Sequence, residues 1–500
     1  MTEPALDLRE AAKWPRLGIP GFSFADLHDP QRLAALTAAF DRDLHAADPG
    51  LFARFEQHRQ TPFTGPNEGD LLIEVSRHVS RFLGKLFRVG DEQAGLRSAA
   101  GRDAVIFRVK REFVQRRVFK KGVAGRPTAD EFPALDDAVQ PLLRAAAARD
   151  PRASSAAGDA ELVLATVIDA LLDGASAPDQ FHTLREAMAR GLDDRGEQPD
   201  RARELRSRAP RLHEALLDLF DRWCFAATLH PQGRHATHGW SLLRLPHALD
   251  FQALVPLRRP KPYAMEGVPE HQRRRDGFKL TDPRATAREV RGEIDYCIYC
   301  HARDKDSCSK GFREKDSDRY KKNPLGIPLT GCPLEERISE MHLAAREGDM
   351  VAALALVCID NPMAPGTGHR ICNDCMKACV YQKQDPVNIP QIETRVLTDV
   401  LRLPWGFEIW SLLTRWNPLR IERPHPRPYC GVDVLVVGMG PAGYTLAHHL
   451  LNEGFGVVGI DGLKVEPLDP ELVNRERAVE DYDAQFGAPL DERVLSGFGG

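Results

Sequence analysis

Apolar residues recur three and four positions apart, with charged residues between them, along most of the first 285 residues. Such a pattern is typical of helices that bury one face. It is clearest over residues 30–59, 71–87, 160–172 and 202–227. Breaks rich in Pro and Gly separate these stretches. We therefore predict a mostly α-helical domain over residues 1–285, in which no motif indicates a role.

The pattern changes close to the C-terminal end of the sequence. Residues 432–437 form a short, apolar, β-branched run, which is typical of a buried parallel strand. A glycine-rich turn follows, and residues 444–452 then continue as a helix that ends at Gly454. A second apolar run at 456–460 predicts another strand, which is followed directly by Asp461. This order predicts a strand, turn, helix and strand of the Rossmann type.

The turn itself has the spacing G-x-G-x-x-G, formed by Gly438, Gly440 and Gly443, with Pro441 and Ala442 between the last two. The first glycine permits the tight turn, the second lets the backbone approach a pyrophosphate, and the third allows close packing of helix and strand. The helix N-terminus stabilises the phosphates, and Asp461 is placed to accept a hydrogen bond from a ribose hydroxyl. We predict a dinucleotide site here, and this chemistry alone suits FAD and NAD equally.

Composition excludes several classes of protein. The chain has 500 residues, and 68 Lys and Arg stand against 72 Asp and Glu, a formal net charge of −4. That balance provides no field for nonspecific nucleic-acid binding. No apolar run reaches the roughly 18 residues that span a bilayer, and the first residues, MTEPALDLRE, do not resemble a secretion signal. We expect a soluble, cytoplasmic protein that binds no nucleic acid and has no membrane span.

Eight of the ten cysteines fall between residues 297 and 379. Dense cysteine in an intracellular chain indicates metal or redox chemistry rather than disulfides. Close pairs supply two thiolates from one turn of backbone, which suits zinc and Fe-S clusters alike. Seven of the cysteines are patterned as ligands: Cys297, Cys300, Cys308, Cys332, Cys372, Cys375 and Cys379. Cys358 lies in the apolar run MVAALALVCI, where a free cysteine is usually a small buried residue.

Counting ligands leaves two interpretations open. One structural zinc needs four groups, which Cys297, Cys300, Cys372 and Cys375 could supply. Two 4Fe-4S clusters need eight, and seven cysteines with one other donor make eight. A zinc-stabilised binding or scaffold protein without redox activity is therefore the alternative to an Fe-S protein.

Residues from about 295 to 461 resemble the N-terminal half of the glutamate synthase small subunit and the matching part of dihydropyrimidine dehydrogenase. The segments that carry the resemblance are CIYC at 297–300, GCPLEERISEM at 331–341, NPMAPGTGHRIC at 361–372, CMKAC at 375–379, DPVNIPQIE at 385–393 and VGMGPAG at 437–443. The resemblance implies a helical domain with two Fe-S clusters, followed by an FAD-binding Rossmann domain. It also implies that Gly438, Gly440, Pro441, Ala442, Gly443 and Asp461 hold FAD.

The family pattern further implies the ligands of each cluster. Cys297, Cys300, Cys308 and Cys379 would ligate one, and Cys332, Cys372 and Cys375 the other, with Glu393 as its fourth ligand. The chain departs from this pattern in three places. A 23-residue insertion separates Cys308 from Cys332, the spacing of Cys372 and Cys375 is compressed, and Asp461 replaces a glutamate.

These inferences predict a multidomain chain: residues 1–285 helical, 286–400 a helical domain with two clusters, 401–430 a linker, and 431–500 the start of an FAD-binding α/β Rossmann domain. Three tryptophans of the linker, Trp405, Trp410 and Trp416, are interpreted as packing residues. Only 62 residues follow Gly438, whereas an FAD domain with its nicotinamide domain needs at least ~250. We therefore expect a truncated form of a longer protein, which by itself would not bind FAD tightly.

The predicted function is an Fe-S flavoprotein oxidoreductase, dependent on FAD and NAD(P)H and similar to the glutamate synthase small subunit. Electrons would pass between NAD(P)H, FAD and the two 4Fe-4S clusters to an electron-acceptor or oxidoreductase partner protein. The NAD(P)H site is expected to lie outside this chain. No residue is assigned as a general base or nucleophile, and no oligomeric state is predicted.

Overall fold

The computed structural model describes residues 17–120, 124–149, 151–156, 158–173, 210–269, 277, 284–303, 305–315, 317–368 and 371–462. Their contacts divide the chain into two compact units. The first contains the described parts of Met1–Ser98 and His247–Gly500, and the second is formed from Ala99–Pro246. Each unit has a separate hydrophobic core.

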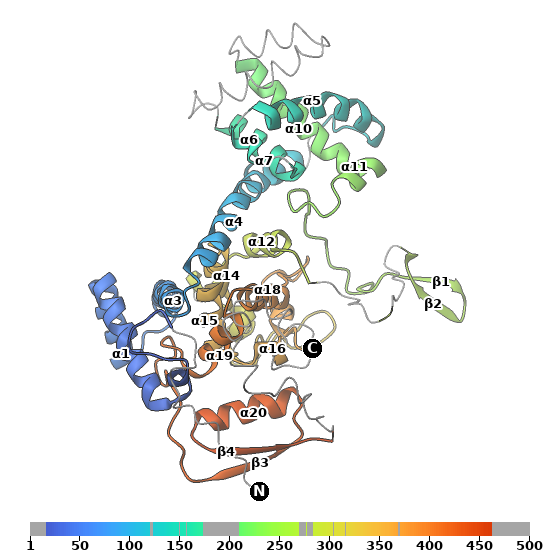
Figure 1. Cartoon of the computed structure of the whole chain (residues 1–500). Coiled ribbons are helices and arrows are strands. Elements are labelled where there is room, and N and C mark those ends of the chain that lie inside the picture. Colours follow the sequence, from blue (N-terminus) through green and yellow to red (C-terminus); the bar gives the residue numbers. More distant parts are fainter. Residues whose placement is uncertain are drawn as a thin grey trace. The chain divides into compact units, whose positions relative to one another are not determined.

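The second unit is helical. Its helices are the end of α4 (Gly90–Val109), which continues into a π-helical segment at Lys110–Val118, then α5 (Phe132–Arg149), α6 (Pro151–Ser154), α7 (Ala160–Leu172), α10 (Pro210–Leu229) and α11 (Pro231–Ala236) (Figure 1). The core of the unit includes Phe107, Phe113, Phe220 and Trp223, none of which is more than 1% exposed. The helical pattern predicted for residues 160–172 is confirmed by α7, whereas residues 202–209 of the stretch 202–227 lie outside the described residues.

The first unit contains the N-terminal helices and the cysteine-rich segment together. Its longer helices are α1 (Pro30–Ala47), α2 (Pro49–Gln60), α3 (Pro66–Phe87), α12 (Ala287–Tyr296), α14 (Ile338–Arg346), α15 (Met350–Asp360), α18 (Ile389–Leu401) and α19 (Gly406–Arg415). Shorter turns lie at Ala25–His28, Cys300–Arg303, α13 (Ser307–Lys310), α16 (Ala364–Thr367) and α17 (Asp374–Lys377). Side chains cap several of these helices: the Asp29 carboxylate accepts the Gln31 N–H at 2.8 Å, and Thr286 and Glu289 form a capping box at α12.

Helix α3 packs against α14 and α15, so the N-terminal helices share one core with the cysteine-rich segment (Figure 1). Apolar residues of α3 such as Val75 and Val79 are fully buried in that core, as is Leu354 of α15. A buried hydrogen bond joins the same helices, with the Ser80 hydroxyl donating to Asp349 Oδ1 at 2.5 Å. This division differs from the expected boundaries at residues 285 and 400. Periodicity identifies the apolar face of a helix but not the helix that it packs against.

The segment expected to be a linker, 401–430, contains α19 and three tryptophans. Trp410 is 5% exposed and Trp416 is 0% exposed, and Trp405 is half-buried. Their interpretation as packing residues is confirmed. Part of the segment therefore belongs to the core, and its role is more than connection.

Residues 433–460 form a parallel strand, helix and strand unit. Strands β3 (Asp433–Val437) and β4 (Gly456–Ile460) pair in parallel, with Asp433 opposite Gly456 and Val437 opposite Ile460. Helix α20 (Pro441–Asn452) connects them (Figure 1). The predicted order of elements is confirmed over this range, and the rest of 431–500, from residue 463 onward, lies outside the described residues.

The burial of the first strand does not follow the prediction. Leu435 is 59% exposed and Val437 is 75% exposed, and of the strand's residues only Val436 is buried. Parallel strands are normally covered on both faces, whereas this sheet has two strands and one described helix. Among the described residues, the only other sheet is an antiparallel pair, β1 (Leu257–Lys261) with β2 (Ala264–Gly267).

None of the described helices combines the length and apolar character that crossing a lipid bilayer requires.

Candidate functional site

Four of the predicted thiols share one neighbourhood. Cys297 ends α12, Cys300 begins the following 3-10 turn, Cys308 lies in α13, and Cys379 follows α17. The pKa of the Cys297 thiol is raised to about 12, first by burial and then by the nearby Cys300 and Cys379. Burial also raises the pKa of Cys308 well above its usual range, and Cys297 and Cys379 add to that shift. We call these four residues the first cysteine group.

The other three predicted thiols form a second cysteine group: Cys332, Cys372 and Cys375. Burial, followed by the charge of Glu336, raises the pKa of Cys332 to about 12, and Cys372 contributes to the same shift. The pKa of Cys375 is raised by burial and then by Cys332, with smaller effects from two carboxylates and Cys372. Cys372 is exposed, whereas Cys375 is half-buried.

The 23-residue insertion does not separate the two groups, because its ends meet. The Cys332 N–H donates to the Cys308 carbonyl at 2.8 Å, and the Phe312 N–H donates to the Leu329 carbonyl at 2.8 Å. Gly311 and Gly331 come close enough that a Cβ on either would strike the backbone of the other side, and their φ values of +86° and +78° favour glycine. The insertion is thus a loop whose two ends, at Cys308 and Cys332, are joined by backbone hydrogen bonds.

A backbone N–H group is directed at one of the sulfur atoms: the Tyr299 N–H donates to Cys297 Sγ at 3.4 Å. The raised pKa of Cys332 is partly offset by the backbone of Glu336 and Leu334, and that of Cys379 by the backbone of Tyr381, Val387 and Val380. Hydrogen bonds to ligand sulfurs are among the features that set the potential of Fe-S clusters. The two cysteine groups, which contain four and three thiols, fit the predicted pair of 4Fe-4S clusters.

Over the described residues, no three His, Cys, Asp or Glu side chains converge as ligands of a single metal ion do. In a four-iron cluster, each thiolate ligates a different iron atom. The assignment of these thiols to clusters accordingly rests on their grouping and on their order in the chain.

Two buried carboxylates lie beside the second cysteine group. Glu393, in α18, is 7% exposed, and its Oε1 accepts a hydrogen bond from Asn361 Nδ2 at 3.2 Å. Glu336 is 6% exposed, and burial raises its pKa to about 7. Cys358 is also buried nearby, in α15, where both carboxylates add to its raised pKa. The sequence analysis did not single out Glu336, which lies four residues after Cys332.

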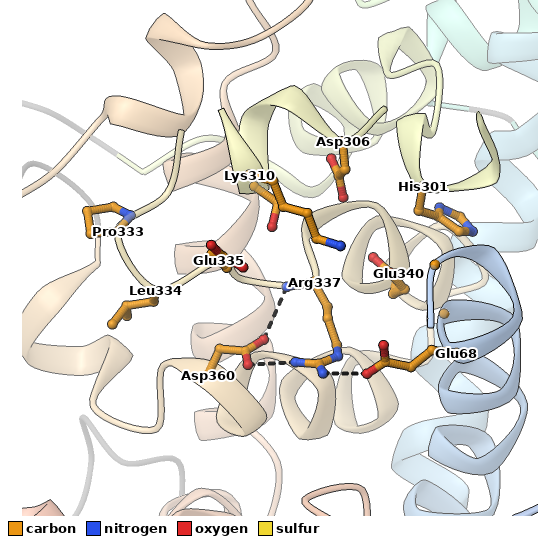
Figure 2. A pocket seen from close by; sticks show the side chains of 13 residues that line it. Glu68, His301, Asp306, Lys310, Pro333, Leu334, Glu335, Arg337, Glu340 and Asp360 are labelled. Atoms are coloured by element: carbon orange, nitrogen blue, oxygen red, sulfur yellow. Dashed lines mark hydrogen bonds and ion pairs between the residues drawn. The ribbon is translucent and has the colours of Figure 1, made fainter. Parts of the chain in front are cut away.

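A cavity of about 490 Å³ has residues from the start of α3 and from α14 in its wall, together with neighbours in sequence of the first cysteine group (Figure 2). Its wall includes His301, which follows Cys300, and Asp306, whose Oδ1 accepts a hydrogen bond from Cys308 Sγ at 3.1 Å. Figure 2 shows Arg337 between Glu68 and Asp360, and its guanidinium donates to each carboxylate at 2.6 Å. Through these two ion pairs, Arg337 links Glu68 of α3 to Asp360 of α15, and all three residues line the cavity.

Replacing Arg337 with methionine keeps the apolar stem but leaves two half-buried carboxylates without their cation. We expect the R337M variant to lose about 2–3 kcal/mol of unfolding free energy, somewhat below the range for fully buried pairs, because the Arg337 side chain is 26% exposed. Urea unfolding measures the effect. The matched control is Arg54→Met, which removes an exposed pair with Glu74 and should cost at most about 1 kcal/mol. Equal losses in the two variants would contradict this role of Arg337.

The glycine-rich turn brings together the residues predicted for the dinucleotide. Gly438 has φ +92°, and a Cβ on Gly443 would strike the Gly438 carbonyl oxygen, so both positions require glycine. A Cβ on Gly440 would meet nothing within 4 Å, which leaves open space at the N-terminus of α20. Pro441 and Ala442 form the exposed first turn of that helix.

Asp461 reaches back to the same turn, where its Oδ2 accepts the Met439 N–H at 2.6 Å. Its carboxylate therefore lies beside the open helix N-terminus. This is the relative position that an acidic residue binding a ribose hydroxyl needs. The residues fit a dinucleotide, and they do so on an exposed surface of the described chain.

Comparison with known proteins finds relatives that each match part of the chain. Residues 17–88 match the family model of the RP005 N-terminal alpha-helical domain. The uncharacterized protein RP006 of Rickettsia prowazekii is 51% identical over 138 residues, which is 28% of this chain and 19% of that protein. The uncharacterized protein RP005 of the same organism is 46% identical over 61 residues, 11% of this chain and 20% of its own length.

The chain is also distantly similar to the glutamate synthase (NADPH) small chain of Mycobacterium tuberculosis. The two are 32% identical over 135 residues, which is 26% of this chain and 25% of the relative. The chain thus spans about a fifth to a quarter of the length of these relatives. No solved structure matches it.

Proposed function

We propose that this chain belongs to an Fe-S flavoprotein oxidoreductase that passes electrons between NAD(P)H, FAD and two 4Fe-4S clusters. The observation that carries the proposal is the order of its parts: two groups of thiols, then a glycine-rich turn in a parallel strand, helix and strand unit. The similarity to the glutamate synthase small chain supports the same interpretation. When bound, the flavin would take up a hydride and the clusters would carry single electrons.

Each residue has a role in this proposal. Cys297, Cys300, Cys308 and Cys379 hold one cluster, and Cys332, Cys372 and Cys375 hold the other together with a carboxylate. The turn from Gly438 to Gly443 admits the pyrophosphate of FAD to the N-terminus of α20, and Asp461 orients the ribose. The nicotinamide cofactor and an electron-acceptor or oxidoreductase partner protein complete the proposal.

The state of the cysteines supports a reducing compartment such as the cytoplasm. All ten are unpaired, including the exposed Cys372 and Cys430. Free thiols of this density persist where disulfides are kept reduced.

Metal analysis of the chain purified without oxygen tests the proposal. We expect about eight irons and about as many acid-labile sulfides per chain, the content of two 4Fe-4S clusters. Broad visible absorption should bleach with dithionite. Zinc without iron would contradict the proposal and favour the zinc-stabilised scaffold instead. A flavin extraction from the same preparation examines the dinucleotide site independently of the metal.

A further inference from the structure

The first cysteine group takes its thiols from two segments that lie far apart in the sequence. Three of them follow α12, from Cys297 onward, whereas Cys379 comes after α17. Such a site needs contacts that hold the second segment beside the first, because groups outside the ligand set orient the ligands. Two tyrosines are placed to provide them: Tyr296 directly precedes Cys297, and Tyr381 lies two residues after Cys379.

The rings of these two tyrosines are stacked. Their centroids are 4.3 Å apart, and the ring planes differ by only 8°. Stacked aromatic rings attract each other beyond the effect of the area that they bury. Since each ring belongs to a residue next to a ligand position, the stack joins the segment that carries Cys297 to the segment that carries Cys379.

Both hydroxyls hydrogen-bond to the backbone of the opposite segment. The Tyr381 hydroxyl donates to the Tyr296 carbonyl at 3.1 Å, and that carbonyl belongs to the peptide bond that leads into Cys297. The Tyr296 hydroxyl donates to the Asp385 carbonyl at 2.9 Å and accepts from the side-chain amide of Gln384. These contacts run in both directions, so each segment restrains the other.

The stack lies at the boundary between the first cysteine group and solvent. Tyr296 and Tyr381 are half-buried, as is Cys297, whereas Cys379 is buried. Partly exposed rings beside a buried ligand position limit the access of water to it. Solvent exposure is one of the features that set the potential of an Fe-S cluster.

We propose that Tyr296 and Tyr381 are positioning residues of the first cysteine group: their stack holds Cys379 beside Cys297 and shields the cluster bound there from water. The inference rests on the proposed function. Because the two tyrosines adjoin ligands of one group only, loss of the stack should affect one cluster and leave the other unchanged.

The test compares Tyr381→Leu, which removes the stacked ring, with Tyr381→Phe, which keeps the ring and removes the hydroxyl. Each full chain is purified without oxygen, and a chelator then withdraws its iron. We expect Y381L to release about four of about eight irons at least about tenfold faster than the unmodified chain, the effect of losing an outer partner. Y381F should release them at most about fivefold faster, because it loses one hydrogen bond.

The matched control is Tyr263→Leu. It removes a ring that is 84% exposed, in the turn between β1 and β2, and should release iron as the unmodified chain does. The second cluster provides a control within each variant, because its four irons remain bound only in a folded chain.

The potentials of the two clusters give a second measurement, which a general loss of stability would not change. In a redox titration followed by electron paramagnetic resonance, Y381L should shift the midpoint potential of one cluster and leave the other at its original value. Tyr296→Leu should give the same pattern. The two substitutions combined should accelerate iron release by less than the product of their separate effects, because the two rings form one contact.

Three results would overturn the inference. The first is equal release of iron by Y381L and the unmodified chain, and the second is equal release by Y381L and Y381F. The third is equally faster release from both clusters, which would indicate a loosened fold instead of a lost positioning contact. Iron-free unmodified chain would instead contradict the proposed function itself.

Discussion

Serine in place of Cys297 should reduce the iron content from about eight atoms per chain to about four, because one 4Fe-4S cluster loses a thiolate ligand. Cys297 belongs to the first cysteine group; it is half-buried, whereas Cys300, Cys308 and Cys379 are buried. Serine at Cys375, in the second group, should remove the other four. The double variant should then contain almost no iron, because the two groups have no ligand in common. Iron and sulfide analysis of the three variants measures the effect directly.

The controls are the cysteines outside the two groups. Cys430 is exposed and Cys358 is buried among apolar side chains of α15. Cys430→Ser and Cys358→Ala should each keep about eight irons. If the double variant kept as much iron as each single variant, the two substitutions would be removing the same iron atoms. The donors would then form a single site, which would contradict the assignment of the thiols to two clusters. Loss of iron from C358A would assign Cys358 to the ligands.

The grouping of the thiols illustrates what the sequence can and cannot predict. The spacing of Cys297 and Cys300 follows from local geometry, since two residues between cysteines form one turn of backbone. The nearness of Cys308 to Cys332 does not, because it depends on how the intervening 23 residues fold. Gly311 and Gly331 close that loop, and glycine spacing alone did not indicate that its ends meet.

Glu336 shows a second limit. In the sequence it is one acidic residue among the charged residues of CPLEER, and most such residues are exposed. Its neighbour Glu335 is exposed as expected, whereas Glu336 is 6% exposed. The difference arises from the turn after Cys332 and from α15 and α18, which lie far along the chain. By contrast, the order of β3, α20 and β4 was predictable, because the glycine spacing and strand pattern are local.

The division into units was the least predictable feature, because the helical periodicity of residues 17–98 is similar to that of 99–246. The two stretches differ in the core to which their described residues belong: 17–98 pack in the core of the first unit, and 99–246 form the second unit with a core of its own. Residues 17–88, which match one family model, all lie in the first unit. In the structure, Trp416 at the end of α19 contacts Phe40 of α1 and Phe82 of α3.

Alanine in place of Trp416 should lower the unfolding free energy of the first unit by roughly 3–5 kcal/mol, the range for removing a buried aromatic side chain. The Trp416 ring is 0% exposed and packs against Phe82 and Phe40, with ring centroids 5.7 and 6.3 Å away. Its indole N–H also donates to the Thr37 hydroxyl at 3.0 Å. Urea unfolding of W416A measures the loss.

A matched control separates this packing from a general effect of losing a tryptophan. Trp240 belongs to the core of the second unit and is only half-buried, so Trp240→Ala should leave the unfolding of the first unit unchanged. The Phe82→Ala and Trp416→Ala effects should be non-additive by about 0.5–3 kcal/mol, because the two rings are in contact. A loss below about 1 kcal/mol in W416A, typical of a surface site, would contradict the shared core.

Because α3 also packs on the helices beside the second cysteine group, W416A should in addition release iron faster, and that coupling would make residues 17–98 a structural part of the cluster domain.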